Sequence, residues 1–143
     1  MIILDTDHLT VLKYPNDSNH RMLLQHMDHR SSDQDFVTTV ITVEEQMRGW
    51  LAFIHKAREI HQQVPAYDQL ISLFDFFSRL TILPFCQQAA DAFQTLRKQK
   101  VRIGAMDLKI AAIAMTHNAR LLSANLRDFQ KVENLRVENW LTI

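Results

Sequence analysis

The sequence has few of the residues that mark secreted, membrane-spanning or repetitive proteins. Its single cysteine, Cys86, excludes an intramolecular disulfide and fits the reducing cytoplasm. No apolar run is long enough to cross a bilayer, and the apolar N-terminal run of four residues stops at Asp5, so we expect neither a membrane helix nor a signal peptide. Only two glycines and three prolines occur in 143 residues, and no repeat or linker is evident. With 47% hydrophobic residues, the chain is expected to form a single domain over residues 1–143.

Net charge is zero, but the charges are unevenly distributed along the chain. Residues 1–96 carry 7 basic and 12 acidic side chains, whereas residues 97–136 carry 9 basic and 3 acidic ones. A basic segment beside an acidic one suits a nuclease, because cations must hold the phosphate backbone near catalytic acids. Ordinary solvated helix faces would give the same counts, so the asymmetry supports a nuclease without establishing one.

Short β-branched runs alternate with helical patterns along the chain. Such alternation predicts an α/β fold of three layers, in which a mostly parallel sheet of four to five strands is flanked by helices on both faces. We expect strands at residues 2–5, 36–41, 80–85 and 120–123, with a weaker one at 135–138. We expect helices at residues 19–29, 42–62, 66–79, 87–100 and 105–117.

Isolated acidic or amide residues stand where the expected strands end or the expected helices begin. Asp5 directly follows the first strand, and Asp107 falls in the first turn of the last expected helix. In open α/β sheets, ligands bind beyond the carboxyl ends of the strands, so these residues can reach one edge of the sheet. Carboxylates without a cysteine or histidine cluster suit the hard cations Mg²⁺ and Mn²⁺, and the pattern predicts a metal-dependent enzyme acting on phosphate esters. The residues concerned are Asp5, Asp7, Glu45, Asp107, Asn125 and Asp128.

Each of these residues also has an ordinary structural role open to it. Asp5 or Asp7 could cap the N-terminus of a following helix, and Asp107 near a helix N-terminus gains from the helix dipole alone. Asn125 and Asp128 could hydrogen-bond their own loop backbone. We favour the functional interpretation because the alternative requires that every one of these residues has only a structural role.

The local pattern does not decide the role of Glu45. Thr42 and Glu45 have the spacing of a helix-capping box, which would place Glu45 in the first turn of the helix. Glu44 competes with Glu45 for a catalytic role. Capping and catalysis therefore both remain open for Glu45.

Four motifs occur in order along the chain, and together they resemble a known family. They are Leu4-Asp5-Thr6-Asp7; Thr42-Val43-Glu44-Glu45 with Gly49; Ile103-Gly104-Ala105-Met106-Asp107 with Ile110-Ala111-Ala112; and Leu122-Ser123-Ala124-Asn125-Leu126-Arg127-Asp128-Phe129. The series resembles the PIN-domain ribonucleases, specifically the VapC-type toxins of bacterial toxin–antitoxin pairs. The resemblance extends over essentially the whole chain, to the ending Glu138-Asn139-Trp140, and it implies a PIN-like fold.

The resemblance implies a set of catalytic residues. Asp5, Glu45 and Asp107 match the family's metal-binding acids. The fourth catalytic position falls at Asn125, where the family often has Asp, and Asp128 lies close behind. Either Asn125 or Asp128 could therefore complete the site.

The resemblance also separates two neighbouring acids and adds supporting groups. Glu45 is preferred to Glu44 because the family acid lies three residues after the Thr and four before the Gly. Asp7, Thr6 and Ser123 are possible supporting groups. The family often has Asn where Asp7 stands, so Asp7 could add charge to the site.

The chemistry that the resemblance implies is hydrolysis of phosphodiester bonds in RNA. The acids would hold one or two Mg²⁺ (or Mn²⁺) ions that activate a water, while Asp5 or Asp107 orients or deprotonates that water. Arg48, Lys109 and Arg127 are the cations nearest to the acids in sequence and could hold RNA phosphates, with plain surface charge as an equal alternative. Single-stranded or loop RNA is the expected substrate, because its bases can be splayed away from a helix.

The resemblance further implies partners. VapC-type toxins are usually homodimers, inhibited by a VapB-like antitoxin whose tail enters the catalytic groove. An acidic groove would accept an arginine or lysine side chain of that tail. Six large apolar residues could form the docking surface or could belong to the core. They are Leu23, Met27, Trp50, Leu51, Phe53 and Ile54.

Two other functions remain open. An apolar strand followed by Asp5 and Asp7 also resembles the nucleophile motif of haloacid-dehalogenase-like phosphatases, in which Asp5 would be phosphorylated. The late segment Ser123-Ala124-Asn125 lacks the adjacent acids of that family. The third possibility is a non-catalytic PIN-like module that binds RNA or a partner, although such a module has no need of buried acids.

Overall fold

The structure, a computed structural model, describes residues 1–30 and 34–142. Its centre is a sheet of five parallel strands in the order β3-β2-β1-β4-β5, which confirms the predicted α/β fold. The strands are β1 (Ile2–Leu4), β2 (Phe36–Thr39), β3 (Ile82–Leu83), β4 (Arg120–Leu122) and β5 (Val137–Glu138). Because β1 lies between β2 and β4, residues that follow β1 stand at the centre of the carboxyl edge of the sheet.

Seven helices and one 3₁₀ turn are found in the described residues. They are α1 (Thr6–Lys13), α2 (His20–Arg30), α3 (Val40–Lys56), η1 (Ile60–Gln63), α4 (Val64–Ser78), α5 (Gln87–Lys98), α6 (Ala105–Thr116) and α7 (Leu126–Phe129). Within the ranges that the structure covers, no helix combines the length and the apolar character needed to span a bilayer.

Helices cover both faces of the sheet, because successive side chains of a strand point to opposite faces. Ile3 of β1 and Leu121 of β4 belong to the core that includes α5 and α6. Leu4 and Leu122, one residue further along each strand, belong to the core that includes α1, α2 and α4. The molecule is therefore built in the three layers expected from the sequence.

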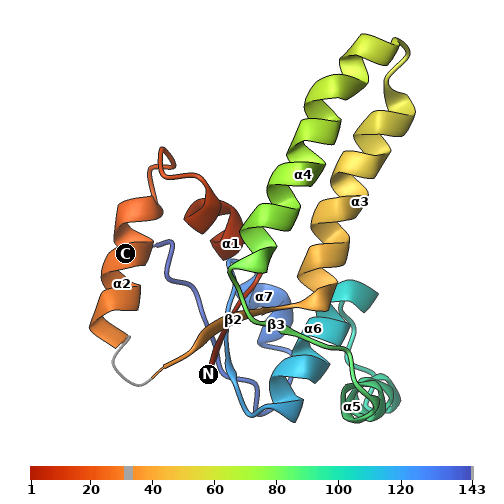
Figure 1. Cartoon of the computed structure of the whole chain (residues 1–143). Helices are drawn as coiled ribbons and strands as arrows, with labels where there is room; N and C mark the ends of the chain where they lie inside the picture. The colour runs from red at the N-terminus through yellow and green to blue at the C-terminus, as the bar shows by residue number, and fades with distance from the viewer. Residues whose placement is uncertain (31–33, 143) are drawn as a thin grey trace.

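Helices α3 and α4 pack side by side as a long hairpin that projects away from the sheet (Figure 1). Its surface decides which of the six candidate docking residues are accessible. Leu23 and Ile54 are buried and belong to the interior, Met27 and Trp50 are partly buried, and Leu51 and Phe53 are exposed. The exposed large apolar side chains of the hairpin beyond its first turn are Leu51, Phe53, Ile60, Val64, Tyr67, Ile71 and Phe74.

Helix α3 begins two residues earlier than expected, which corrects the assignment around residue 42. Thr39 is the N-cap, and its hydroxyl oxygen accepts a hydrogen bond from the backbone N–H of Thr42 at 3.2 Å. The strand predicted at 36–41 therefore ends at Thr39, and the capping box of Thr42 with Glu45 is wrong. Glu45 consequently lies in the second turn of α3 rather than in the first.

The predicted helix 42–62 is also too long. Helix α3 ends at Lys56, where Ala57 turns extended and donates its N–H to the carbonyls of Phe53 and Ile54. No glycine or proline stands at this point. The chain reverses there because α4 packs back along α3, which is a tertiary constraint and not a local breaker signal.

Candidate active site

Asp5 lies at the buried end of β1, at the centre of the carboxyl edge of the sheet, and its side chain is held by two neighbours. One carboxylate oxygen, Oδ1, accepts a hydrogen bond from the backbone N–H of Thr6 at 2.8 Å, which makes Asp5 the N-cap of α1. The other, Oδ2, accepts from the hydroxyl of Ser123 at 2.8 Å. The capping role considered from the sequence is therefore present, and a second strand end reaches the same carboxylate.

The environment of Asp5 disfavours its charge. Burial and the nearby Asp7 and Asp107 carboxylates raise the pKa of Asp5 to about 7, although the hydrogen bonds from Thr6 and Ser123 act in the opposite direction. Only 6% of the residue is exposed. Ionised Asp5 is thus costly unless a cation reaches it.

Glu45, rather than Glu44, joins this group. The hydroxyl of Thr6 donates a hydrogen bond to Glu45 Oε2 at 3.0 Å, which links the second turn of α3 to the start of α1. Burial raises the pKa of Glu45, and the Asp107 and Glu44 carboxylates raise it further. Glu44 instead forms an ion pair with Arg48 on the same helix, at 2.5 Å.

Asp107 lies in the first turn of α6, on the face of the sheet that α5 and α6 cover. The Asn125 side chain connects it to Asp128. The Asn125 amide donates to Asp107 Oδ2 and to Asp128 Oδ2, each at 3.1 Å. Burial raises the pKa of Asp107, as does the neighbouring charge of Asp128. The backbone N–H of Asn125 donates to the hydroxyl of Ser123 at 3.0 Å, so the loop after β4 holds both Asp5 and Asp107.

Asp128 differs from the other acids because cations surround it. The hydrogen bond from Asn125 lowers the pKa of Asp128, and the positive charges of Lys131 and Arg127 lower it further. Lys131 Nζ lies 3.5 Å from Asp128 Oδ1. Asp128 therefore stands at the margin of the acidic group, with Asn125 between it and Asp107.

Asp7 is occupied by contacts that the sequence did not indicate. Its Oδ1 lies 2.6 Å from Nδ1 of His8, and its Oδ2 accepts the backbone N–H of Ala124 at 2.9 Å. Burial alone would raise the pKa of Asp7, but the hydrogen bonds from His8 and Ala124 outweigh it and lower the pKa. Asp7 therefore ties α1 to the loop after β4.

His8 is fully buried and was missed from the sequence. Its Nε2 accepts the backbone N–H of Trp140 at 3.1 Å, which leaves Nδ1 to donate to Asp7. The one available signal was a histidine directly after an acidic residue at a strand end, which by itself predicts nothing about burial. Asp7, His8 and Trp140 form a hydrogen-bonded chain that fixes the start of α1.

The three cations expected near the acids occupy different positions. Arg48 is neutralised by Glu44 on α3. Lys109 is partly buried on α6, and Arg127 is exposed on α7. Within residues 1–30 and 34–142, none of these cations forms an ion pair with Asp5, Glu45 or Asp107.

The donor set suits a hard divalent cation, although the side chains do not yet enclose one. In the part of the chain that the structure describes, no three His, Cys, Asp or Glu side chains stand close enough to hold a metal ion as they are placed. Asp5, Glu45 and Asp107 nevertheless bring only oxygen donors, and burial together with neighbouring carboxylates raises the pKa of each. An uncompensated group of carboxylates fits Mg²⁺ or Mn²⁺ in charge and in ligand type.

Comparison with known proteins finds both sequence and fold relatives. A family model described as the PIN domain matches residues 2–135. Ribonuclease VapC2 of Haemophilus influenzae is 44% identical over 71 residues, which cover 47% of this chain and 54% of that protein. The chain spans about half the length of the curated relatives it matches.

Two solved structures are similar over almost the full length of the chain. The DNA-bound VapBC from Salmonella typhimurium is 22% identical, covers 97% of each chain and has a TM-score of 0.70. The toxin–antitoxin complex from Klebsiella pneumoniae is 20% identical, covers 100% of each chain and has a TM-score of 0.63. At these identities the likeness shows a shared fold.

Proposed function

The chain belongs to the PIN-domain family, and we propose that it is a metal-dependent endoribonuclease of the VapC type. It would hydrolyse phosphodiester bonds in single-stranded or loop regions of RNA, with Mg²⁺ or Mn²⁺ as cofactor. Relatives named Ribonuclease VapC support the activity, and the acidic group at the sheet edge supplies the chemistry.

One observation carries the proposal more than any other. Asp5, Glu45 and Asp107 come from three separate segments and lie at one edge of the sheet, and burial and neighbouring carboxylates raise the pKa of each. No basic side chain among the described residues pairs with them. Such an arrangement costs stability, and a bound divalent cation would offset that cost.

The residues of the site have distinct proposed roles. Asp5, Glu45 and Asp107 would hold the metal, which when bound polarises a phosphate and lowers the pKa of a water. Ser123 donates to Asp5 and so favours its ionised form in a fixed orientation. Thr6 does the same for Glu45 through its hydroxyl.

The fourth position of the site is proposed to be Asn125. Its amide contacts Asp107 directly, whereas the carboxylate of Asp128 is shared with Lys131. Asn125 would therefore orient Asp107, and Asp128 would act on Asn125 from outside. Asp7 would serve as a positioning residue through Ala124, because both of its oxygens are already engaged.

Of the three cations expected to bind RNA, two remain candidates. Arg48 already pairs with Glu44, so it is less available to bind a phosphate. Lys109 lies two residues after Asp107, and Arg127 lies between Asn125 and Asp128 in sequence. Lys109 and Arg127 would therefore hold phosphates flanking the scissile bond.

The two alternative functions are less well supported. A phosphatase would use Asp5 as a nucleophile, but both Asp5 oxygens accept hydrogen bonds and the chain matches a different family. A binding module would not require three carboxylates without basic partners. Moving such charges out of water costs free energy and adds nothing to core packing.

We also propose a VapB-like antitoxin and a second copy of the chain as partners. The Klebsiella pneumoniae structure with the same fold is a toxin–antitoxin complex. Exposed apolar side chains such as Phe53, Ile71 and Phe74 give the α3–α4 hairpin a surface that water does not favour. A basic side chain of an antitoxin would find carboxylates to pair with at the sheet edge.

The decisive experiment is cleavage of bulk RNA by protein stripped of any copurifying polypeptide, with Mg²⁺ or Mn²⁺ and with EDTA. Asp5→Ala is the test variant, and Asp75→Ala, an exposed acid paired with Arg79, is the matched control. We expect metal-dependent cleavage by the parent and by Asp75→Ala only. Equal cleavage by Asp5→Ala, or release of phosphate from a small phosphomonoester without RNA cleavage, would overturn the proposal.

A further inference from the structure

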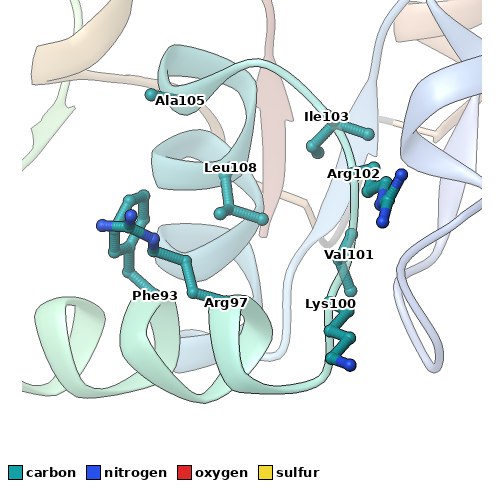
Figure 2. A pocket seen from close by; sticks show the side chains of 8 residues that line it. All are labelled: Phe93, Arg97, Lys100, Val101, Arg102, Ile103, Ala105 and Leu108. Atoms are coloured by element: carbon teal, nitrogen blue, oxygen red, sulfur yellow. The ribbon is translucent and has the colours of Figure 1, made fainter.

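A basic cavity of about 430 Å³ lies between α5, the start of α6 and the loop that joins them (Figure 2). Arg97 at the end of α5 and Lys100 and Arg102 in the loop supply its charge. Phe93 and Leu108 supply apolar surface. Its volume is within the range of about 300–1,000 Å³ that small-molecule pockets occupy, so a nucleotide-sized group can enter it.

The charge of this cavity is not compensated by the protein. Among the described residues, Arg97, Lys100 and Arg102 take part in no ion pair. The guanidinium of Arg97 lies over the ring of Phe93, 5.6 Å from its centroid. Figure 2 shows Arg97 and Phe93 on one side of Leu108, with Lys100 and Arg102 on the other. The cavity therefore combines a stacked, flat cation on one side with two free cations on the other.

The cavity is connected to the acidic site by contacts of the structure. Ala105, which lines the cavity, precedes Asp107 by two residues on α6. On the loop side, Lys131 Nζ donates to the backbone carbonyl of Arg102 at 3.3 Å and lies 3.5 Å from Asp128. Asp128 shares the Asn125 amide with Asp107. The lining of the cavity and the acidic group are therefore joined through α6 and through the contacts of Lys131 with Arg102 and Asp128.

We propose that this cavity binds a nucleotide of the single-stranded RNA that is cleaved at the acidic site, one or more positions from the scissile bond. Lys100 and Arg102 would contact its backbone phosphates. Its base would stack against the guanidinium plane of Arg97, which Phe93 supports from behind. The inference rests on the proposed ribonuclease function, since it assigns a part of the same substrate. It assigns a place to three cations of the basic segment 97–136 that are not among Arg48, Lys109 and Arg127.

The test measures RNA binding separately from cleavage. Fluorescence anisotropy with a short unstructured RNA oligonucleotide, in EDTA and over a series of salt concentrations, compares the parent with Lys100→Gln/Arg102→Gln and with Arg97→Gln. Glutamine is chosen at 100 because this residue has a φ of 61°, and glutamine meets the same backbone strain there as lysine. The matched control is Lys56→Gln/Arg58→Gln, which removes two charges at the far end of the α3–α4 hairpin. A DNA oligonucleotide of the same sequence shows whether the sugar is read.

We expect the double variant in the loop to bind RNA about tenfold more weakly than the parent, with a salt slope reduced by about 0.7 for each phosphate that the protein no longer neutralises. Arg97→Gln should weaken binding with little change in salt slope, and the control should bind as the parent does. Binding that is undetectable in the parent, or equal losses of affinity in the loop and control variants, would overturn the inference.

Cleavage in Mg²⁺, measured with the same proteins, separates the two proposals. If the parent cleaves RNA and the loop variant binds RNA as well as the parent does, the proposed nucleotide site is refuted and the proposed ribonuclease function stands. If the loop variant binds RNA more weakly but the parent does not cleave RNA, the cavity stands as an RNA-binding site and the proposed ribonuclease function is refuted.

Discussion

The hydroxyl of Ser123 donates a hydrogen bond to Asp5 Oδ2 at 2.8 Å, across 118 positions of sequence. The contact exists because β1 and β4 are neighbours in the sheet and end at the same edge. It places a neutral donor against a carboxylate that the nearby acids Asp7 and Asp107 destabilise. Ser123 therefore helps to set the ionisation of Asp5, and that role can be tested.

Ser123→Ala should raise the pKa of Asp5 further, because it removes a hydrogen bond that favours the ionised carboxylate. If cleavage requires ionised Asp5, the variant should lose activity most at neutral pH and recover part of it as the pH rises. A pH–rate profile at a fixed Mg²⁺ concentration below saturation, where a proton on Asp5 competes with the metal, measures this shift. Ser78→Ala, at the exposed end of α4, is the control and should keep the parent profile. A uniform loss at every pH would contradict the prediction.

Asp5→Asn should stabilise the metal-free protein at alkaline pH. Burial and neighbouring acids raise the folded-state pKa of Asp5 to about 7 from an ordinary value of 3.8, so the folded state holds the proton more tightly. The resulting stability is fully present below the unfolded pKa and is lost as the pH rises through the folded one. In EDTA at about pH 8, we expect the variant to unfold with a free energy larger by on the order of 2–4 kcal/mol.

Urea denaturation at several pH values measures this difference in unfolding free energy. The difference should shrink as the pH falls toward about 4, where both forms carry a neutral side chain. Asp91→Asn on the exposed side of α5 should show no such pH dependence. A difference that stays constant with pH would show that ionisation of Asp5 is not its cause.

Glu45→Gln and Glu44→Gln should differ sharply although they are adjacent. Glu45 accepts from Thr6 at the acidic site, whereas Glu44 pairs with the exposed Arg48. We expect Glu45→Gln to lower the rate of RNA cleavage by about a hundredfold and Glu44→Gln to leave it within about twofold. Rates in Mg²⁺ on one RNA substrate provide the measurement. Equal losses would remove the assignment of Glu45 as the metal-binding acid.

His8→Ala should lower stability by about 2–4 kcal/mol, because it removes a fully buried ring that bonds Asp7 and accepts the Trp140 N–H, and it opens a cavity. The unfolding free energy from urea denaturation at neutral pH is the measurement. His29→Ala, exposed on α2, is the matched control and should change stability by less than about 0.5 kcal/mol. Similar stabilities for the two variants would mean that the hydrogen-bonded chain of Asp7, His8 and Trp140 contributes little.

Mg²⁺ should stabilise the parent protein and should have little effect on Asp107→Asn. Binding to the folded state alone adds about 2.7 kcal/mol when the free metal is about a hundredfold above its Kd. Thermal unfolding against Mg²⁺ concentration gives the shift, and Asp75→Asn, outside the site, should respond as the parent does. An equal shift in Asp107→Asn would place the ion elsewhere.

The sequence indicated the α/β class and the residues at the sheet edge because both depend on local information. Short β-branched runs and helical periodicity predicted all five strands within a few residues. The short helices α1 and α7 were not predicted, since 8 and 4 residues carry too little periodicity to stand out. The first residue of α3 was also missed, because Thr39 and Thr42 are chemically equivalent as caps and only the end of β2 selects Thr39.

By itself, the sequence determined that acids would stand at strand ends and helix starts, and the resemblance ranked Glu45 above Glu44. The tertiary structure decided which partners they have. It joined Asp5 to Ser123, placed the Asn125 amide between Asp107 and Asp128, and buried His8 against Trp140. It also gathered Arg97, Lys100 and Arg102 around one cavity. Periodicity reports only which face of an element a residue occupies, whereas these contacts depend on the order in which strands pair, and that order is settled by packing across the whole chain.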